Sequence, residues 1–193
     1  MGVHELHETA KAIVDDHKGI LAADESTGTI KKRFDSIGVE STEESRRAYR
    51  QLLFTASGME ESIGGVILYD ETIRQSTDDG TSFAEVLASK GAIPGIKVDT
   101  GAQDQAGFPG EKITEGLDGL RGRLAEYREL GARFAKWRAV ITIDDDIPPS
   151  GASGRTRTRS PAMPRSARRP GSCRSSSPRS SWTPTTLSSA ATR

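Results

Sequence analysis

Charged side chains stand inside a segment that otherwise has the composition of a buried strand. Residues 134–143 form a largely apolar run that contains Lys136 and Arg138. Side chains at alternate positions of a strand point to the same face, so the two cations share one face. A cation that faces a core is destabilising unless it has a partner or a function. The segment is therefore a candidate part of a functional site.

Two further strand-like segments carry charge in the same way. Residues 95–99 contain Lys97, and the apolar run of residues 19–24 closes on Asp24. Charge near the ends of three apolar segments indicates one polar pocket, built where strands end.

Composition divides the chain into two parts. Residues 1–147 hold 18 basic groups and all 27 acidic groups. Residues 148–193 hold 9 arginines, 12 serines and 7 of the 9 prolines, with no acid and no lysine. Low hydrophobicity with high net charge cannot offset chain entropy, so we expect a disordered tail over residues 148–193. As an alternative function, this basic tail would bind nucleic acid without sequence preference.

One cysteine and three histidines limit the kinds of site that the chain can hold. A single cysteine, Cys173, excludes an internal disulfide and a thiolate metal cluster. His4, His7 and His17 have no metal-ligand company and are expected at the surface. No apolar run approaches the roughly 20 residues that span a bilayer, and no signal-peptide core is present. We expect a cytoplasmic protein with no metal and no membrane contact.

Strand-like and helix-like segments alternate along residues 1–147. Apolar runs predict strands over residues 19–24, 64–70, 93–99 and 134–143. Helical spacing predicts helices over residues 4–17, 27–37, 41–56, 82–89 and 116–130. This alternation is typical of α/β folds with parallel strands. Charge near several strand ends favours a (β/α)8 barrel with its site at the carboxyl rim, and a flavodoxin-like open sheet is the competing architecture.

The third helix carries its own start signal. Ser41 with Glu44 resembles a capping box, and Tyr49, Leu52 and Leu53 are expected to face inward. A second such pair, Ser82 with Glu85, opens the helix of residues 82–89.

Six motifs in these segments resemble class I fructose-bisphosphate aldolase, the metal-independent Schiff-base type. They are Gly-Ile-Leu-Ala-Ala-Asp-Glu-Ser-Thr-Gly (19–28), Arg-Gln-Leu-Leu (50–53), Gly-Gly-Val-Ile-Leu (64–68), Gly-Ile-Lys-Val-Asp (95–99), Gly-Leu-Asp-Gly-Leu (116–120) and Phe-Ala-Lys-Trp-Arg (134–138). The resemblance implies a partial TIM barrel of about four βα units. It also implies reversible cleavage of fructose 1,6-bisphosphate in glycolysis, without a cofactor.

The resemblance also implies roles for seven residues. Asp24 and Lys136 correspond to catalytic groups, whereas substrate and phosphate binding falls to Ser26, Thr29, Arg33, Lys97 and Arg138. Plainer alternatives exist for some of them. Asp24 could cap the following helix, and Arg33 could lie on a solvated helix face. Lys136 and Arg138 could form structural ion pairs with acids such as Asp24 or Asp99, and Asp99 is expected to pair with a lysine.

The tail departs from the family completely. Plausible codons for residues 172–183, read one base earlier, give Leu-Val-Pro-Ile-Val-Glu-Pro-Glu-Val-Leu-Met-Asp, which is similar to the family's fifth-strand motif. This predicts a frameshift near residues 147–153. The family's Schiff-base lysine lies on the sixth strand, which the resemblance does not reach in this sequence. We therefore expect an inactive product whose site groups are exposed or mispaired. The intact family is usually homo-oligomeric, and open sheet edges predict aggregation of a half barrel.

Overall fold

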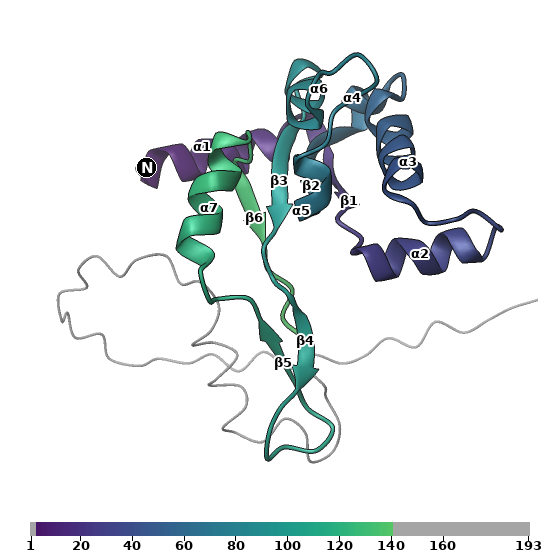
Figure 1. The fold of residues 1–193 in the computed structure, drawn as a ribbon. Helices are drawn as coiled ribbons and strands as arrows, with labels where there is room; N and C mark the ends of the chain where they lie inside the picture. The colour runs from purple at the N-terminus through teal and green to yellow at the C-terminus, as the bar shows by residue number, and fades with distance from the viewer. Residues whose placement is uncertain (1–2, 141–193) are drawn as a thin grey trace, which may run out of the picture. The chain divides into compact units, whose positions relative to one another are not determined.

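The described part of the chain is built on a four-stranded parallel sheet. The computed structural model describes residues 3–140. The strands lie in the order β1 (Gly19–Ala23), β2 (Ile63–Leu68), β3 (Ile93–Lys97) and β6 (Phe134–Lys136), and each neighbouring pair is parallel. All four predicted strands are present, each shorter than its apolar run (Figure 1). The predicted tail and the boundary at residue 147 lie outside the described residues.

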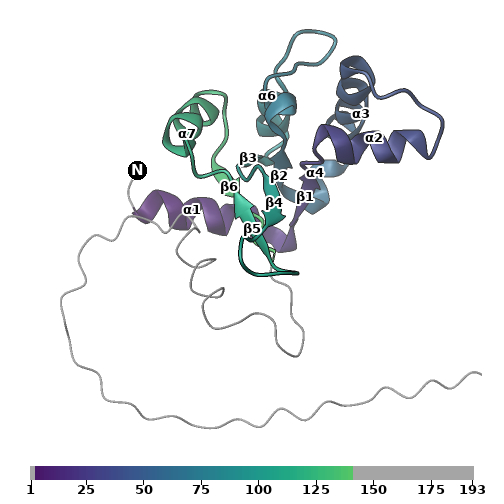
Figure 2. The same ribbon diagram turned by 60° about the horizontal axis from the view of Figure 1, so that its bottom comes forward.

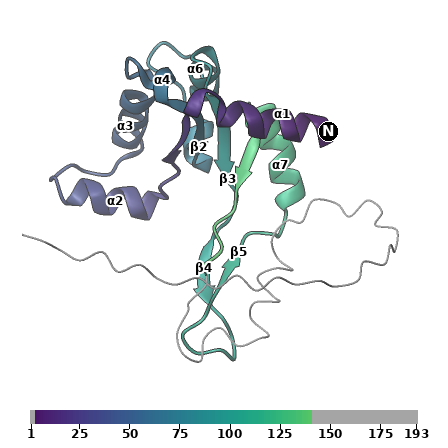
Figure 3. The same cartoon turned by 180° about the vertical axis from the view of Figure 1, so that it is seen from behind.

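Helices connect the strands. They are α1 (Val3–Ile13), α2 (Thr27–Asp35), α3 (Glu43–Thr55), α4 (Met59–Ser62), α5 (Asp70–Ile73), α6 (Phe83–Ser89) and α7 (Leu120–Glu129), with a 3₁₀ turn at Asp15–His17. Helices α7, α6 and α3 follow one another around one side of the sheet (Figure 2), and α1 crosses the amino-terminal ends of the strands (Figure 3). Across residues 3–140, every helix is too short or too polar to traverse a bilayer.

A hairpin that the sequence did not predict interrupts the connection from β3 to β6. Strands β4 (Gly101–Asp104) and β5 (Lys112–Glu115) pair antiparallel and extend from the carboxyl end of β3 (Figure 1). Their side chains are mostly exposed, so the segment lacks the apolar run or clean alternation that marks a strand in sequence.

The caps show how local polar residues set the helix starts. Ser82 and Glu85 form the predicted capping box of α6. In α3 the predicted pair is wrong by one residue. Thr42 accepts a hydrogen bond from the Ser45 amide at 3.1 Å, and Ser45 accepts one from the Thr42 amide at 3.0 Å. A serine hydroxyl can replace glutamate here because it reaches the same orphan amide.

The core lies between the sheet and the helices on its outer side. Its buried members are Ala23, Phe54, Val66, Leu68, Ile73, Phe83, Leu87, Ala92, Ile96, Val98, Leu120, Tyr127 and Ala132. Phe54 of α3 and Phe83 of α6 meet edge to face, with ring centroids 5.3 Å apart. The inward position predicted for Leu52 is wrong, because that side chain is 69% exposed. The buried residues of α3 are instead Phe54 and a cation, Arg50.

Two strand glycines allow close approach of neighbouring elements. A Cβ atom at Gly64 would overlap the carbonyl oxygen of Ile13, where α1 ends against β2. At Gly95 it would overlap the ring of Phe134, which lies on the adjacent strand β6. Glycine therefore permits both the α1–β2 contact and the packing of the Phe134 ring.

We predict that Gly64→Ala lowers the free energy of unfolding by about 1–3 kcal/mol, because the added methyl group meets backbone rather than a movable side chain. Gly122→Ala in α7 is the control. Its methyl group enters open space, and alanine favours helix by about 1 kcal/mol over glycine. Denaturant titration of both variants measures the effect. Equal stability of Gly64→Ala and the unmodified chain would contradict the close approach of α1.

Candidate active site

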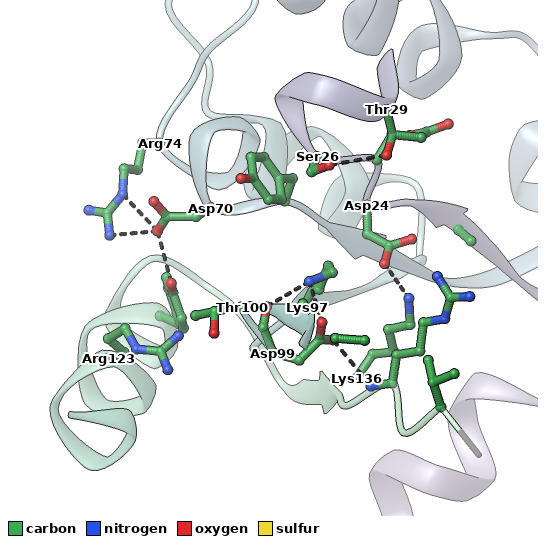
Figure 4. Close-up of a pocket in the computed structure, with 18 of the residues that line it drawn as sticks. Asp24, Ser26, Thr29, Asp70, Arg74, Lys97, Asp99, Thr100, Arg123 and Lys136 are labelled. Carbon is green, nitrogen blue, oxygen red and sulfur yellow. Dashed lines mark hydrogen bonds and ion pairs between the residues drawn. The ribbon is translucent and has the colours of Figure 1, made fainter. Parts of the chain in front are cut away.

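A polar pocket of about 790 Å³ opens at the carboxyl ends of the parallel strands. Its walls come from the ends of β1, β3 and β6 and from helices α2 and α7 (Figure 4). All seven residues singled out in the sequence line this pocket: Asp24, Ser26, Thr29, Arg33, Lys97, Lys136 and Arg138. The prediction of one pocket at strand ends is confirmed.

An ion pair between Lys136 and Asp24 crosses the pocket (Figure 4). Lys136 ends β6, Asp24 directly follows β1, and the two lie 112 positions apart in sequence. Their side chains are 30% and 10% exposed. The capping alternative for Asp24 is wrong, because α2 begins after Ser26, which is the N-cap residue. The ion-pair interpretation of Lys136 is correct, and the pair lies inside the pocket.

A second ion pair anchors Lys97 at the end of β3. Its ammonium group donates to Asp99 Oδ1 at 2.5 Å and to the Asp99 carbonyl oxygen at 2.6 Å. The other carboxylate oxygen of Asp99 accepts from the Arg138 backbone amide at 3.1 Å. Asp99 thus fixes both the lysine and the chain that continues from β6, as expected of a lysine-pairing acid.

The loop from β1 into α2 carries hydroxyl groups. Ser26 Oγ and Thr29 Oγ1 lie 3.1 Å apart, and the Ser26 side chain makes no capping hydrogen bond. The uncapped end of a helix, with its dipole and amide groups, suits an anion. Arg33, on the next turn of α2, is 59% exposed and pairs with Glu25. The solvated-face interpretation of Arg33 is therefore correct in part, since the same residue lines the pocket.

The expectation of exposed or mispaired groups holds for only some of the site. Lys97 and Lys136 are half-buried and paired with acids in the pocket. Arg33 and Arg138 are exposed at its wall. Among residues 3–140, no cluster of three or more His, Cys, Asp or Glu side chains is arranged to hold a metal ion.

The far side of the pocket contains a network that sequence reasoning missed. Tyr127 of α7 donates to Asp70 Oδ1 at 2.9 Å, and Arg74 pairs with Asp70 at 3.0 Å and with Glu126 at 2.5 Å. Burial, and then the Asp70 hydrogen bond, raises the pKa of Tyr127. The Arg74 guanidinium lowers the pKa of Glu126. The i,i+4 spacing of Asp70 and Arg74 was the available signal, whereas the link to α7 depends on tertiary contact.

Comparison with known proteins shows the family of the chain. The family model "Fructose-bisphosphate aldolase class-I" matches residues 5–160. This chain belongs to that family. A "Probable fructose-bisphosphate aldolase class 1" of Xanthomonas campestris pv. campestris is 63% identical over 148 residues, covering 77% of this chain and 44% of that protein. The Arabidopsis thaliana "Fructose-bisphosphate aldolase 5, cytosolic" is 58% identical over 139 residues, covering 72% and 39%.

A solved aldolase shares the fold. The structure of fructose-bisphosphate aldolase from Plasmodium falciparum, in complex with TRAP and a small-molecule inhibitor, matches with a TM-score of 0.74 and 49% identity. The match covers 78% of this chain and 44% of that one. The aldolase chain described here thus spans less than half the length of these relatives. The predicted α/β class and partial TIM barrel are confirmed, and a flavodoxin-like sheet is wrong.

We predict that Arg74→Met raises the pKa of the Glu126 carboxyl group toward its ordinary value, because the guanidinium that favours its charged form is gone. A carboxylate whose folded pKa is depressed stabilises the protein above its unfolded pKa. That contribution is lost as the pH falls below about 4.5, and Arg74→Met lacks it. Carbon-13 NMR titration of the side-chain carboxyl groups measures the pKa of Glu126 and that of a control residue. Asp79 is the control, because the hydrogen bond from Thr77, and not Arg74, lowers its pKa. The pKa of Asp79 should stay unchanged in Arg74→Met. An unmoved Glu126 titration would contradict the assignment.

Proposed function

We propose that residues of this chain form the first half of a class I aldolase site, of the Schiff-base type, for fructose 1,6-bisphosphate. The observation that carries the proposal is the meeting of Lys136 and Asp24 across the carboxyl ends of β6 and β1. An acid and an ammonium group held together in a polar pocket can serve proton transfer and charge stabilisation at a sugar carbonyl. Family membership supplies the reaction class. The reaction belongs to glycolysis.

The phosphate on C6 of the sugar would bind beside α2. Ser26 and Thr29 offer hydroxyl donors there, and Arg33 and Lys97 offer positive charge on the same pocket wall. The end of α2 adds its amide groups and dipole. Exposed Arg33 can turn toward an incoming phosphate, whereas Lys97 is already held by Asp99. Arg138, at the opposite wall, would contact the substrate.

Cleavage would need one more amine. In the proposed reaction, a lysine amine attacks the C2 ketone, water leaves, and the resulting iminium accepts the electron pair of the C3–C4 bond. The C4 hydroxyl loses its proton and glyceraldehyde 3-phosphate leaves. The remaining enamine is protonated at C3, and water then releases dihydroxyacetone phosphate and the free amine. Asp24 would orient the iminium and assist bond cleavage. The positive charge of Lys136 would lower the pKa of the neighbouring nucleophilic amine.

No motif in the printed sequence corresponds to the sixth-strand lysine. We therefore propose that these 193 residues bind the substrate without cleaving it, and that residues 148–193 are read out of frame. Resequencing the DNA across the codons for residues 144–153 tests whether the reading frame shifts there. A sequence in which the family's motifs do not continue in any shifted frame would contradict this account. The nucleic-acid alternative concerns residues outside the described range, and no observation favours it.

Self-association is proposed from the sheet edges. Among the described residues, β1 pairs only with β2, and β6 pairs only with β3, so each presents an edge. Open edges template pairing with other chains, which supports aggregation or assembly of half barrels. The name of the cytosolic Arabidopsis relative supports placement in the cytoplasm.

We predict that the purified 193-residue chain binds fructose 1,6-bisphosphate but releases no triose phosphate. Borohydride trapping with labelled substrate should give no adduct on Lys97 or Lys136, because turnover needs the complete preorganised set of groups. Adding the separately expressed carboxyl-terminal portion of the Xanthomonas relative should restore cleavage and convert self-associated chain into a one-to-one complex, as followed by light scattering.

Two controls accompany this test. The Lys136→Met variant of this chain should assemble with the same partner and remain inactive, which separates assembly from chemistry. Triose phosphate released by the unaccompanied chain at an ordinary enzymatic rate would overturn the proposed lack of cleavage. Absence of any substrate binding by a folded chain would overturn the proposed site.

A further inference from the structure

A buried ion pair lies directly behind residues 24–26, the loop that joins β1 to α2 beside the proposed phosphate site. Arg50 of α3 is 2% exposed, and its guanidinium donates to the carboxylate of Glu25, which is 9% exposed. A second nitrogen of the same guanidinium donates to the backbone carbonyl of Glu25 at 3.2 Å. Arg50 therefore fixes both the main chain and the side chain of one loop residue, in a geometry that lysine could not reproduce.

Glu25 stands between the groups that would act on the substrate. It follows Asp24 and precedes Ser26 in the chain, and all three line the pocket. Its two carboxylate oxygens accept from different arginines: one from Arg50, the other from Arg33 on the pocket wall. Without Arg50, Arg33 alone would neutralise Glu25, and its positive charge would no longer be available to an incoming phosphate.

The position of Arg50 is itself fixed by aromatic packing. The guanidinium carbon lies 5.4 Å from the ring centroid of Tyr49, and that ring meets Phe34 of α2 edge to face at 5.8 Å. Because Phe34 shares a helix with Arg33, these contacts tie α3, α2 and the loop together. A buried arginine that donates to both the carboxylate and the carbonyl of Glu25, and that also contacts an aromatic ring, is held in one orientation.

We propose that Arg50 is a positioning residue for the phosphate site, an inference that rests on the proposed function. It neutralises Glu25, so that Arg33 keeps its positive charge available to the substrate, and it fixes the main chain between Asp24 and Ser26. Arg50 itself is buried behind the loop and is absent from the pocket lining, so its effect on the substrate is exerted through Glu25.

The test measures the affinity of the full chain for fructose 1,6-bisphosphate by calorimetry, with circular dichroism to establish folding. Arg50→Met should weaken binding by at least about tenfold, because a buried carboxylate then faces the phosphate with one arginine fewer. Glu25→Gln should bind as tightly as the unmodified chain or more tightly. The double variant Arg50→Met/Glu25→Gln should recover affinity to within about threefold, because no unneutralised carboxylate remains.

Arg47→Met is the matched control, since Arg47 lies on the same helix and pairs with exposed Asp78 at 2.8 Å, away from the pocket. It should leave affinity unchanged. If Arg50→Met does not fold, the double variant decides: recovered binding supports neutralisation of Glu25, and weak binding overturns it. Unchanged affinity in folded Arg50→Met overturns the role of Arg50 alone. An unmodified chain that folds but does not bind overturns the proposed function instead, and one that does not fold overturns the Arg50–Glu25 pair.

Discussion

The Lys136–Asp24 ion pair can form only in a curved sheet. Asp24 follows β1 and Lys136 ends β6, and these strands form opposite edges of the four-stranded sheet. Three interstrand spacings separate the edges by about 14 Å in a flat sheet, which is beyond the combined reach of the two side chains. The strands must therefore curl toward one another at their carboxyl ends. That curl encloses the pocket, and it is the curvature of a barrel sector rather than of an open sheet.

Pairing also explains how charge is tolerated inside the strands. Lys97 and Lys136 each have an acid within hydrogen-bonding distance, and Glu25 has two arginines. Without such partners these half-buried ions would carry a desolvation penalty, smaller than the several kcal/mol of a fully buried ion. The pocket lining thus includes compensated ion pairs at the ends of β1, β3 and β6. Under the proposed function, an entering phosphate would compete with the acid already paired to Arg33 or Lys97, so the acid partners would be part of the binding equilibrium.

Sequence reasoning succeeded where one residue's position depends on its own segment. Apolar runs gave the four strands of the parallel sheet, and charge near their ends pointed to Asp24, Lys97, Lys136 and Arg138. The family resemblance added Ser26, Thr29 and Arg33, which line the same pocket. It failed where tertiary contact decides. Helical periodicity placed Leu52 inward, yet the buried positions of α3 hold Phe54 and Arg50, because Glu25 supplies a buried partner from another element. The hydrogen bond from Tyr127 to Asp70 joins residues 57 positions apart, and no local sequence pattern predicts it.

A barrel rim distributes the groups of a site among several strands, and the parallel sheet of residues 3–140 supplies four of them. The proposed phosphate site beside α2 is local in sequence, since Ser26, Thr29 and Arg33 all follow β1. The proposed acid–base chemistry would need β1 and β6 together, and this sheet brings Lys136 and Asp24 together in an ion pair. In the reaction proposed above, covalent chemistry would need an amine from a strand beyond β6. Under the proposed function, binding, proton transfer and bond cleavage would therefore draw on successively more of the barrel, and the described four-stranded sector would supply groups for the first two.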